Sequence, residues 1–399
     1  IDATAGPGRS GLAVFKDDAV FSSATAQWLF LTCLPGLGRT RRRELLTEFP
    51  DLPQMLSMNA ATLRAVGMTA DAMAAIQAWQ KQDDAHPAIR EVRTILHDCQ
   101  KHAVGILTWE DTHYPEQLRH IHDAPLVLFT RGDTELLARD QIGIIGSRKA
   151  TPAGLDHARR FAAELSARDL MVTSGLALGV DGAAHAGALD AGYPTVAVIG
   201  CGLDRVYPHQ HCRLGERVVA DGLMISEYPP GTPARAAHFP QRNRIISGLS
   251  RGVLVVEAGL RSGSLITARM ALEQGREVFA IPGSVHSPVA RGCHHLIKQG
   301  ARLVETVEDI LEELGAWWSP PLANEAAGTP EPKPGGKGPL AGLDGREIAV
   351  FEALGYDPQS TDALSSATGL PADQLMQSLL LLELQGLVSS APGGFQKIA

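Results

Sequence analysis

Hydrophobic and polar residues recur with two different periods along this chain. From Trp28 to about His97, apolar residues return at helical spacing, as in TRRRELLTEF and ADAMAAIQAWQK, which predicts a group of short helices. From Gly143 onward, Val/Ile-rich runs such as IGIIG, TVAVIG and GVLVVEA alternate with helical segments. Short apolar strands that are each followed by a helix are typical of a parallel sheet covered on both faces.

The change of period divides the chain into five predicted segments. Residues 1–24 are small and lack periodicity, so we expect a disordered leader, and the Pro-, Gly- and Ala-rich stretch 316–340 is typical of a linker. Between them we predict a helical domain over 25–103 and a Rossmann-like, doubly wound α/β domain over 104–315. Three helices and a short hairpin over 341–399 predict a winged-helix domain.

Composition and motifs argue against several classes of protein. The chain has 399 residues, 44% of them apolar, and five scattered cysteines without a CxxC pair, which disfavours a disulfide framework or a zinc ribbon. No apolar run is long enough to span a bilayer, so we expect a cytoplasmic protein without membrane contact. The motifs HExxH and GxxxxGK[ST] are absent, and we expect no catalytic residue, metal or cofactor.

Small polar residues and glycines follow several of the predicted strands. The carboxyl ends of parallel strands form the ligand-binding edge of an open sheet, and helices that start there present free N–H groups to anions. We expect Ser147 to cap the helix that follows it. Glycine is also needed merely to reverse the chain, so each loop alone fits a structural role equally well. The candidate phosphate-binding residues at this edge are Gly146, Ser147, Arg148, Ser174, Gly175, Ser262, Gly263 and Ser264.

The segment HFPQRNRIISG contains a second candidate cluster. It places Arg242, Asn243 and Arg244 at the start of a predicted helix, where cations beside free N–H groups favour an anion. The structural alternative is an ion pair with Glu227 or Glu257 at the ends of neighbouring strands. The pattern leaves both roles open, including one arginine for each.

Two further patterns also fit more than one role. The sequence LPGLGRTRRR, with four arginines between Arg39 and Arg43, resembles a helix-hairpin-helix turn that holds a phosphate. It equally fits a helix cap followed by a solvated basic face. His185 follows Asp181 by four residues on one predicted helix, and there we favour a helix cap and a core histidine over a catalytic pair.

The segments GIIGSR, SGLALGVDGAAH, HFPQRNRIISGLS, VVEAGLRSGSLITA and GCHHLIKQGA, in this order, resemble the DNA-processing protein A (DprA/Smf) family over about residues 110–305. The resemblance implies binding and protection of single-stranded DNA and loading of the RecA recombinase during natural transformation. It also implies a homodimer formed through the Rossmann-like domain and a SAM-like fold for the helical domain.

The same resemblance implies phosphate contacts at three positions. These are Arg148 in GSR, the residue after VYP, which is His209 here, and Arg235 before HFP. Many family members have lysine in place of His209. Because a neutral imidazole carries less charge than an ammonium group, we expect His209 to be a weaker contact than Arg148.

Regional charge favours the middle domain as the DNA-binding part. The net charge of the chain is −8, but residues 131–310 contain 20 Lys and Arg against 18 Asp and Glu, whereas residues 341–399 contain 2 against 7. Phosphate neutralisation supplies most non-specific affinity, so we interpret the acidic tail as a protein-interaction or regulatory module. Phe239 and Tyr207 are candidate stacking platforms, and a buried Phe is the structural alternative.

A nucleotide-binding hydrolase is the alternative from another class. The related lysine-decarboxylase-like phosphoribohydrolases carry PGGxGTxxE with a catalytic Glu, whereas Pro282 and Gly283 are followed here by Ser284 and the Glu is missing. We therefore predict a non-catalytic protein in which a basic groove at the carboxyl edge of the sheet follows the backbone of one DNA strand.

Overall fold

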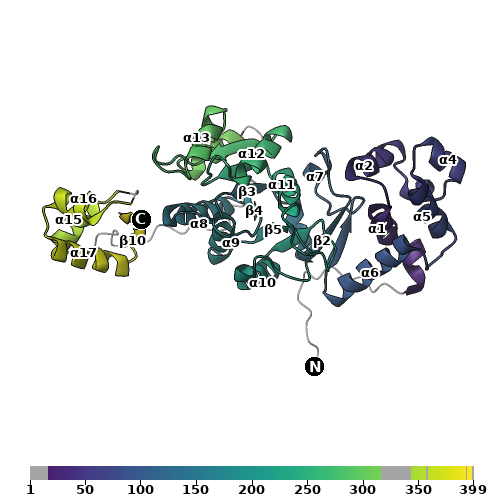
Figure 1. The fold of residues 1–399 in the computed structure, drawn as a ribbon, viewed down its shortest axis with the longest axis horizontal. Helices are drawn as coiled ribbons and strands as arrows, with labels where there is room; N and C mark the ends of the chain where they lie inside the picture. The colour runs from purple at the N-terminus through teal and green to yellow at the C-terminus, as the bar shows by residue number, and fades with distance from the viewer. Residues whose placement is uncertain (1–16, 316–342, 356–357, 392, 398–399) are drawn as a thin grey trace, which may run out of the picture.

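The computed structural model describes residues 17–315, 343–355, 358–391 and 393–397. In this part of the chain, an N-terminal group of helices packs against a large α/β domain, and a small C-terminal unit lies at the opposite end (Figure 1). The predicted linker, 316–340, and residues 1–16 of the predicted leader lie outside the described residues.

The N-terminal part is helical, as its apolar spacing predicts. Ser23, Asp51, Asn59 and Thr69 each accept a backbone N–H at a helix start, which explains where four of these helices begin. The elements are η1 (Asp17–Ser22), α1 (Ala24–Cys33), α2 (Arg39–Glu48), α3 (Leu52–Leu56), α4 (Ala60–Ala65), α5 (Ala70–Gln80) and α6 (Pro87–Lys101).

The predicted leader is too long. Residues 17–22 form η1, in which Val20 is buried, and the Phe21 ring meets the edge of Trp79 at 5.1 Å between centroids. Two apolar residues, Val20 and Phe21, are too few to show a helical periodicity. The contact with Trp79 joins residues far apart in the sequence, so the pattern does not predict it.

A nine-stranded sheet forms the centre of the molecule, in the order β1-β2-β6-β5-β4-β3-β7-β8-β9. Strands β3 to β9 run parallel, as predicted. At one edge β2 pairs antiparallel with β6, and β1 pairs antiparallel with β2. The strands are β1 (Gly105–Thr108), β2 (Val127–Gly132), β3 (Gln141–Ile145), β4 (Met171–Ser174), β5 (Thr195–Ile199), β6 (Leu223–Ser226), β7 (Gly252–Val255), β8 (Glu277–Ala280) and β9 (Arg302–Leu303).

Helices cover both faces of the sheet, which confirms the doubly wound α/β architecture. Ile144 of β3 points into the core beneath one layer of helices and Ile145 into the core beneath the other. The first layer contains α8 (Pro152–Ala167), α9 (Val180–Asp190), α10 (Cys212–Asp221) and α14 (Val307–Leu314). The second contains α7 (Glu116–Arg119), α11 (His238–Leu249), α12 (Gly263–Glu273) and α13 (Arg291–Lys298). Two short turns, η2 (Thr134–Ala138) and η3 (His209–His211), complete the domain.

The strand order reverses direction at β3. The chain moves from β3 through β4 and β5 to β6, then crosses back through α11 to β7 on the other side of β3. In open α/β sheets the loops beyond the carboxyl ends of the strands diverge at such a point and leave a crevice for ligands. The topology therefore directs attention to the loops after β3 and β7.

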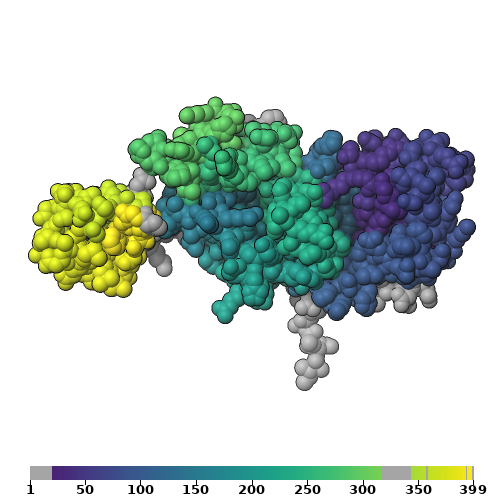
Figure 2. Space-filling view, in the orientation of Figure 1, coloured from purple at the N-terminus to yellow at the C-terminus, as the bar shows by residue number. Residues whose placement is uncertain are grey.

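The C-terminal unit has the predicted winged-helix order, with three helices followed by a hairpin. It forms a lobe (Figure 2) with its own apolar core, which includes Val350, Leu364, Leu379 and Val388. Its elements are α15 (Gly345–Ala353), α16 (Thr361–Thr368), α17 (Ala372–Leu384), β10 (Val388–Ala391) and β11 (Gly394–Lys397).

Within the described ranges, no helix combines the length and apolarity needed to cross a membrane. The same residues contain no group of three or more His, Cys, Asp or Glu side chains that could hold a metal ion.

His185 belongs to the core of the sheet domain. Its side chain is fully buried on α9, and its Nδ1 lies 2.8 Å from Thr195 Oγ1. Burial, reinforced by the charges of His211 and Arg242, lowers the pKa of His185 from 6.5 to about 3. The geometry supports the core-histidine interpretation over a catalytic pair with Asp181.

This buried imidazole predicts a pH-dependent stability. Below pH 6.5 His185 is protonated in the unfolded chain, whereas in the folded chain its pKa of about 3 keeps the imidazole neutral. The free energy of unfolding therefore falls as the pH drops through this window, by about 1.4 kcal/mol per pH unit from this residue. Urea unfolding at several pH values measures the free energy of unfolding. Below pH 6.5 it should fall less steeply with decreasing pH for His185→Gln than for the wild type. Parallel slopes for the two proteins would contradict the assignment.

Candidate nucleic-acid interface

A cavity of about 580 Å³ opens at the point where the strand order reverses. It lies between the loop after β3, the loop after β7, the start of α12 and the first turns of α11. The sheet topology thus brings together segments that are about a hundred residues apart in the sequence. Of the predicted site residues, those that line this cavity are Gly146, Ser147, Arg148, Arg242, Asn243, Ser262, Gly263 and Ser264.

Four cationic side chains line the cavity. Arg148, Lys149 and Arg261 are exposed, whereas Arg242 is only 4% exposed. Asp181 is the one carboxylate among the described lining residues. The excess of positive charge in a concave, partly desolvated site favours an anionic ligand.

Arg242 is a buried cation held by the backbone. Its Nη1 donates to the carbonyl oxygen of Val198, and its Nε has no acceptor among the residues that the structure describes. Burial lowers the pKa of Arg242 to about 10, opposed by Asp181, so the guanidinium stays charged near neutral pH. A Cβ at Gly175 would collide with this guanidinium, which explains why a glycine occupies that position.

The Asp181 side chain accepts hydrogen bonds from the loop that surrounds Arg242. Its Oδ2 accepts N–H bonds from Gly175 and Ala177 at 3.2 and 3.4 Å. Burial raises the pKa of Asp181 above its usual range, and Arg242 is the main charge that opposes the increase. This carboxylate orders the loop and faces the buried arginine.

The N-terminus of α12 supplies backbone donors to the same cavity. Ser262 is the N-cap, and its Oγ lies 2.6 Å from Ser264 Oγ. Among the described residues, apart from its chain neighbours and its own helix backbone, none has an atom within 4 Å of the place where a Cβ on Gly263 would lie, so this helix start is open to an approaching group. Free N–H groups and the positive end of the helix dipole suit a phosphate.

Ser147 does not cap the following helix, contrary to our prediction. α8 begins at Pro152, and its N-cap is Thr151, four residues after Ser147; the Thr151 hydroxyl accepts a bond from Gly154 N–H. Ser147 instead accepts a bond from Lys149 N–H at 3.1 Å and keeps the loop at the cavity tightly turned. The sequence signal for this helix start is Thr151 followed by Pro152, an N-cap residue before a proline in the first turn.

An aromatic and cationic surface adjoins the cavity. The Arg148 guanidinium lies over the Phe239 ring at 5.5 Å, and the centroids of Phe239 and Tyr207 are 5.6 Å apart. Tyr207 is 48% exposed and Phe239 partly exposed, so neither is buried as the structural alternative required. Exposed rings beside cations can stack with nucleic-acid bases.

Five predicted site residues do not line the cavity, and Arg244 is one of them. Ser174 is buried and donates to the Ile144 carbonyl oxygen at 2.6 Å, and Gly175 is buried beside Arg242. Both therefore shape the site from beneath. His209 and Arg235 are exposed in segments near Tyr207 and α11, outside the cavity.

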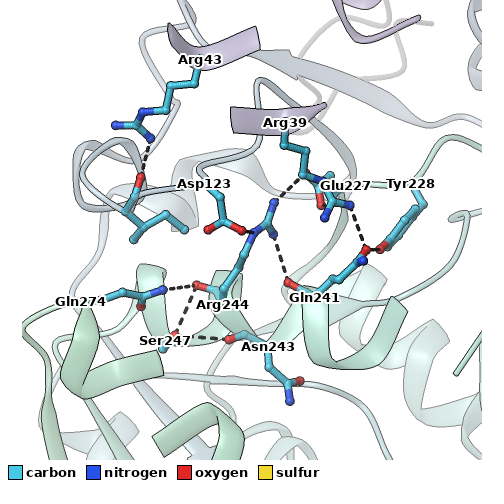
Figure 3. Close-up of polar contacts among 11 residues, drawn as sticks. Arg39, Arg43, Asp123, Glu227, Tyr228, Gln241, Asn243, Arg244, Ser247 and Gln274 are labelled. Atoms are coloured by element: carbon cyan, nitrogen blue, oxygen red, sulfur yellow. Dashed lines mark hydrogen bonds and ion pairs between the residues drawn. The ribbon is translucent and has the colours of Figure 1, made fainter. Parts of the chain in front are cut away.

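Arg244 is held by carboxylates, the structural role that the sequence left open. Its Nε donates to Asp123 Oδ2 and its Nη2 to Glu227 Oε1, both at 2.7 Å, and its side chain is 3% exposed (Figure 3). Burial alone would lower the pKa of Arg244, but Glu227 and Asp123 outweigh burial and raise it. The prediction that Arg244 contacts DNA conflicts with this geometry.

The helix start near these arginines was also misplaced. α11 begins at His238, so Arg242 and Arg244 lie inside the helix rather than beside its free N–H groups. Pro240 fits both the first turn of a helix and a non-helical segment before it, so the sequence alone placed HFP before the helix.

The arginines of α2 join the helical domain to the sheet domain. Arg39 lies 3.2 Å from Glu227 Oε2 and donates to Gln241 Oε1 at 3.0 Å, while Arg43 donates to the carbonyl oxygens of Ile121 and Arg119 (Figure 3). These contacts show that Arg39 and Arg43 do not lie on a freely solvated basic face. The phosphate-holding turn concerns backbone N–H groups and stays a prediction.

Sequence reasoning missed Lys149 and Arg261, which line the cavity with the predicted residues. Both signals were present in the sequence: Lys149 directly follows GSR, and Arg261 directly precedes SGS. A rule that collects every cation in the loops after β3 and β7 would have found them.

The fold and the cavity define a Rossmann-like protein with a cationic crevice at its switch point and a winged helix appended. The family described as DNA recombination-mediator protein A matches residues 105–315, and the DprA winged helix domain matches residues 332–394. The chain therefore belongs to the DNA-processing protein A (DprA/Smf) family, a family of DNA-processing recombination mediators, as its motifs predicted.

Curated relatives and a solved structure agree with this assignment. The chain is 42% identical over 293 residues to Protein Smf of Escherichia coli, covering 71% of this chain and 75% of that protein. It is 48% identical over 203 residues to DNA processing protein DprA of Streptococcus pneumoniae, covering 51% and 72%. The X-ray structure of DNA processing protein A from Streptococcus pneumoniae superposes with a TM-score of 0.64 at 36% identity, covering 73% of this chain and 98% of that one.

The ion cluster around Arg244 predicts a coupled loss of stability. Arg244→Met leaves Asp123 without its cationic partner and Glu227 with Arg39 alone. We expect this to cost roughly 3 kcal/mol, at the low end for a buried pair because Asp123 is partly exposed. Urea unfolding would measure the loss, and amide hydrogen exchange should speed up in both α2 and α11. The matched control Arg235→Met removes an exposed arginine and should change neither. Unaltered exchange in α2 would show that the cluster does not join the domains.

Proposed function

We propose that this protein binds single-stranded DNA at the cavity between β3 and β7. The observation that carries the proposal is the convergence of Arg148, Lys149, Arg242 and Arg261 with the open start of α12 in one crevice. Cations and free N–H groups together satisfy phosphate oxygens. The names of the relatives, DNA processing proteins, support a nucleic acid as the ligand.

The shape of the site favours a single strand over a duplex. A cavity of about 580 Å³ accommodates a nucleotide-sized group. Duplex DNA has a persistence length of about 50 nm and does not bend into such a hollow, whereas a single strand turns sharply at little cost. Phe239 and Tyr207 then lie where unstacked bases of the strand can pack.

Binding, rather than hydrolysis, is the role we assign to the cavity. Asp181, the lining carboxylate, already accepts two backbone N–H bonds and faces Arg242. A general base needs a carboxylate free to approach the substrate. The hydrolase alternative therefore gains no support from this side chain.

The finer parts of the proposal rest on membership of the family. They are protection of incoming DNA, loading of RecA during natural transformation in the cytoplasm, and homodimerisation through the Rossmann-like domain. His209 and Arg235, exposed outside the cavity, are proposed as secondary phosphate contacts along the path of the strand. A dimer would align two cationic crevices for cooperative binding.

Arg148→Ala should weaken binding of fluorescent oligo-dT by about tenfold, since a charge-assisted bond to phosphate is lost. The slope of log affinity against log salt should shrink by about 0.7, the value for one phosphate of a single strand. Fluorescence anisotropy across a salt series measures both. Arg168→Ala is the matched control, because Arg168 is exposed on the same domain and paired with Glu308. Equal losses in both variants would contradict the cavity as the binding site.

A second variant tests Arg242 without removing its charge. The added methyl of Gly175→Ala displaces the guanidinium, so oligo-dT affinity should fall while the net charge is unchanged. Thermal unfolding monitors folding of the variant. Unimpaired DNA binding by a folded Gly175→Ala protein would remove Arg242 from the proposed site.

RecA loading makes a separate prediction. On single-stranded DNA coated with single-strand-binding protein, the wild-type chain should shorten the lag before RecA hydrolyses ATP, and Arg148→Ala should not. The lag reports the arrival of RecA on the DNA. An unchanged lag with the wild type, despite tight oligo-dT binding, would reject loading and leave the DNA-binding proposal intact.

A further inference from the structure

The outward face of α17 in the winged-helix unit is apolar. The helix packs inward through the buried side chains of Leu375, Leu379 and Leu382. On the opposite face Met376, Leu380 and Leu384 are 45%, 57% and 76% exposed. We call these three residues the α17 stripe.

The stripe is continuous. Its members stand four residues apart, a spacing that places side chains above one another on a helix, and Leu381 adds a further 38% exposed leucine beside them. Single exposed leucines are ordinary on protein surfaces, but large aliphatic side chains aligned in a row mark an interaction site.

DNA does not fit this surface, although α17 is the third helix of the unit and winged helices commonly read DNA with that element. α17 contains Asp373 and Glu383 but no Lys or Arg. The two basic residues of 341–399 are engaged elsewhere: Arg346 lies 3.5 Å from Asp344, and the Lys397 ammonium lies over the Phe351 ring. A helix of this composition repels phosphate.

A second copy of the chain is also disfavoured by charge. Asp373 lies near one end of the stripe and Glu383 near the other, and both are exposed. Antiparallel packing of two stripes would bring Asp373 of one copy close to Glu383 of the other, and parallel packing would pair identical carboxylates. Like charges at an interface oppose association, and each unit carries 7 acidic residues against 2 basic ones.

We propose that the α17 stripe docks an amphipathic helix of another protein, one with an apolar face flanked by Lys or Arg. Such a helix buries its apolar face against Met376, Leu380 and Leu384 and places its cations near Asp373 and Glu383. The winged helix then recruits a protein partner while the cavity of the Rossmann-like domain holds the DNA. The proposal does not depend on DNA binding by the cavity.

Two labelled peptides test the charge and the apolar requirement with the full-length chain. Both are short amphipathic helices with the same leucine face, one flanked by lysines and the other by glutamates. In fluorescence anisotropy the lysine peptide should bind at least about tenfold more tightly than the glutamate peptide, and its affinity should fall as salt rises.

A matched pair of variants locates the site. Leu380→Ser combined with Leu384→Ser keeps the net charge and should weaken the lysine peptide by at least about tenfold. Leu272→Ser, which removes a 53% exposed leucine of α12, should leave binding unchanged. Circular dichroism melts check that both variants fold, as expected for exposed positions.

Four results would overturn the proposal. They are equal binding of the two peptides, equal binding by the double variant and the wild type, self-association that only the double variant loses, and duplex DNA binding that only the double variant loses. The third would assign the stripe to a second copy of the chain, and the fourth to DNA.

Discussion

The buried ion cluster of Arg244, Glu227 and Asp123 holds the functional part of the molecule in place. Burying a guanidinium costs several kcal/mol unless carboxylates of good geometry surround it, and here two of them lie at 2.7 Å. Glu227 also forms an ion pair with Arg39 of α2. One cluster therefore orients α11 and joins the helical domain to the sheet, so the position of the cavity depends on contacts outside it.

Two arginines on the same helix have different roles because of helix geometry. Arg242 and Arg244 are two residues apart, which separates their directions by about 200° around α11. Arg242 reaches the floor of the cavity and Val198, while Arg244 reaches the domain interface. Because both arginines lie on α11, the ion pairs of Arg244 at the interface also hold Arg242 in its place at the cavity floor.

Charge is distributed so that the two ends of the described chain suit different partners. The cavity gathers four cations in a protein with a net charge of −8, and the winged-helix unit combines an acidic surface with the exposed α17 stripe. Phosphate favours the first environment, and a basic amphipathic helix favours the second. Global charge alone would have indicated neither partner.

The sequence by itself determined the order of the elements, the parallel sheet, the winged helix, the family, and the loops with GSR and SGS that line the cavity. Those features are local, because periodicity, glycines and turn residues act over a few neighbours. Only the tertiary structure decided that Arg244 is sealed between carboxylates, that Ser174 and Gly175 lie beneath the site, and that α2 contacts the sheet domain. The physical reason is that burial and ion pairing of a side chain depend on partners such as Asp123, which lies 121 residues away in the sequence.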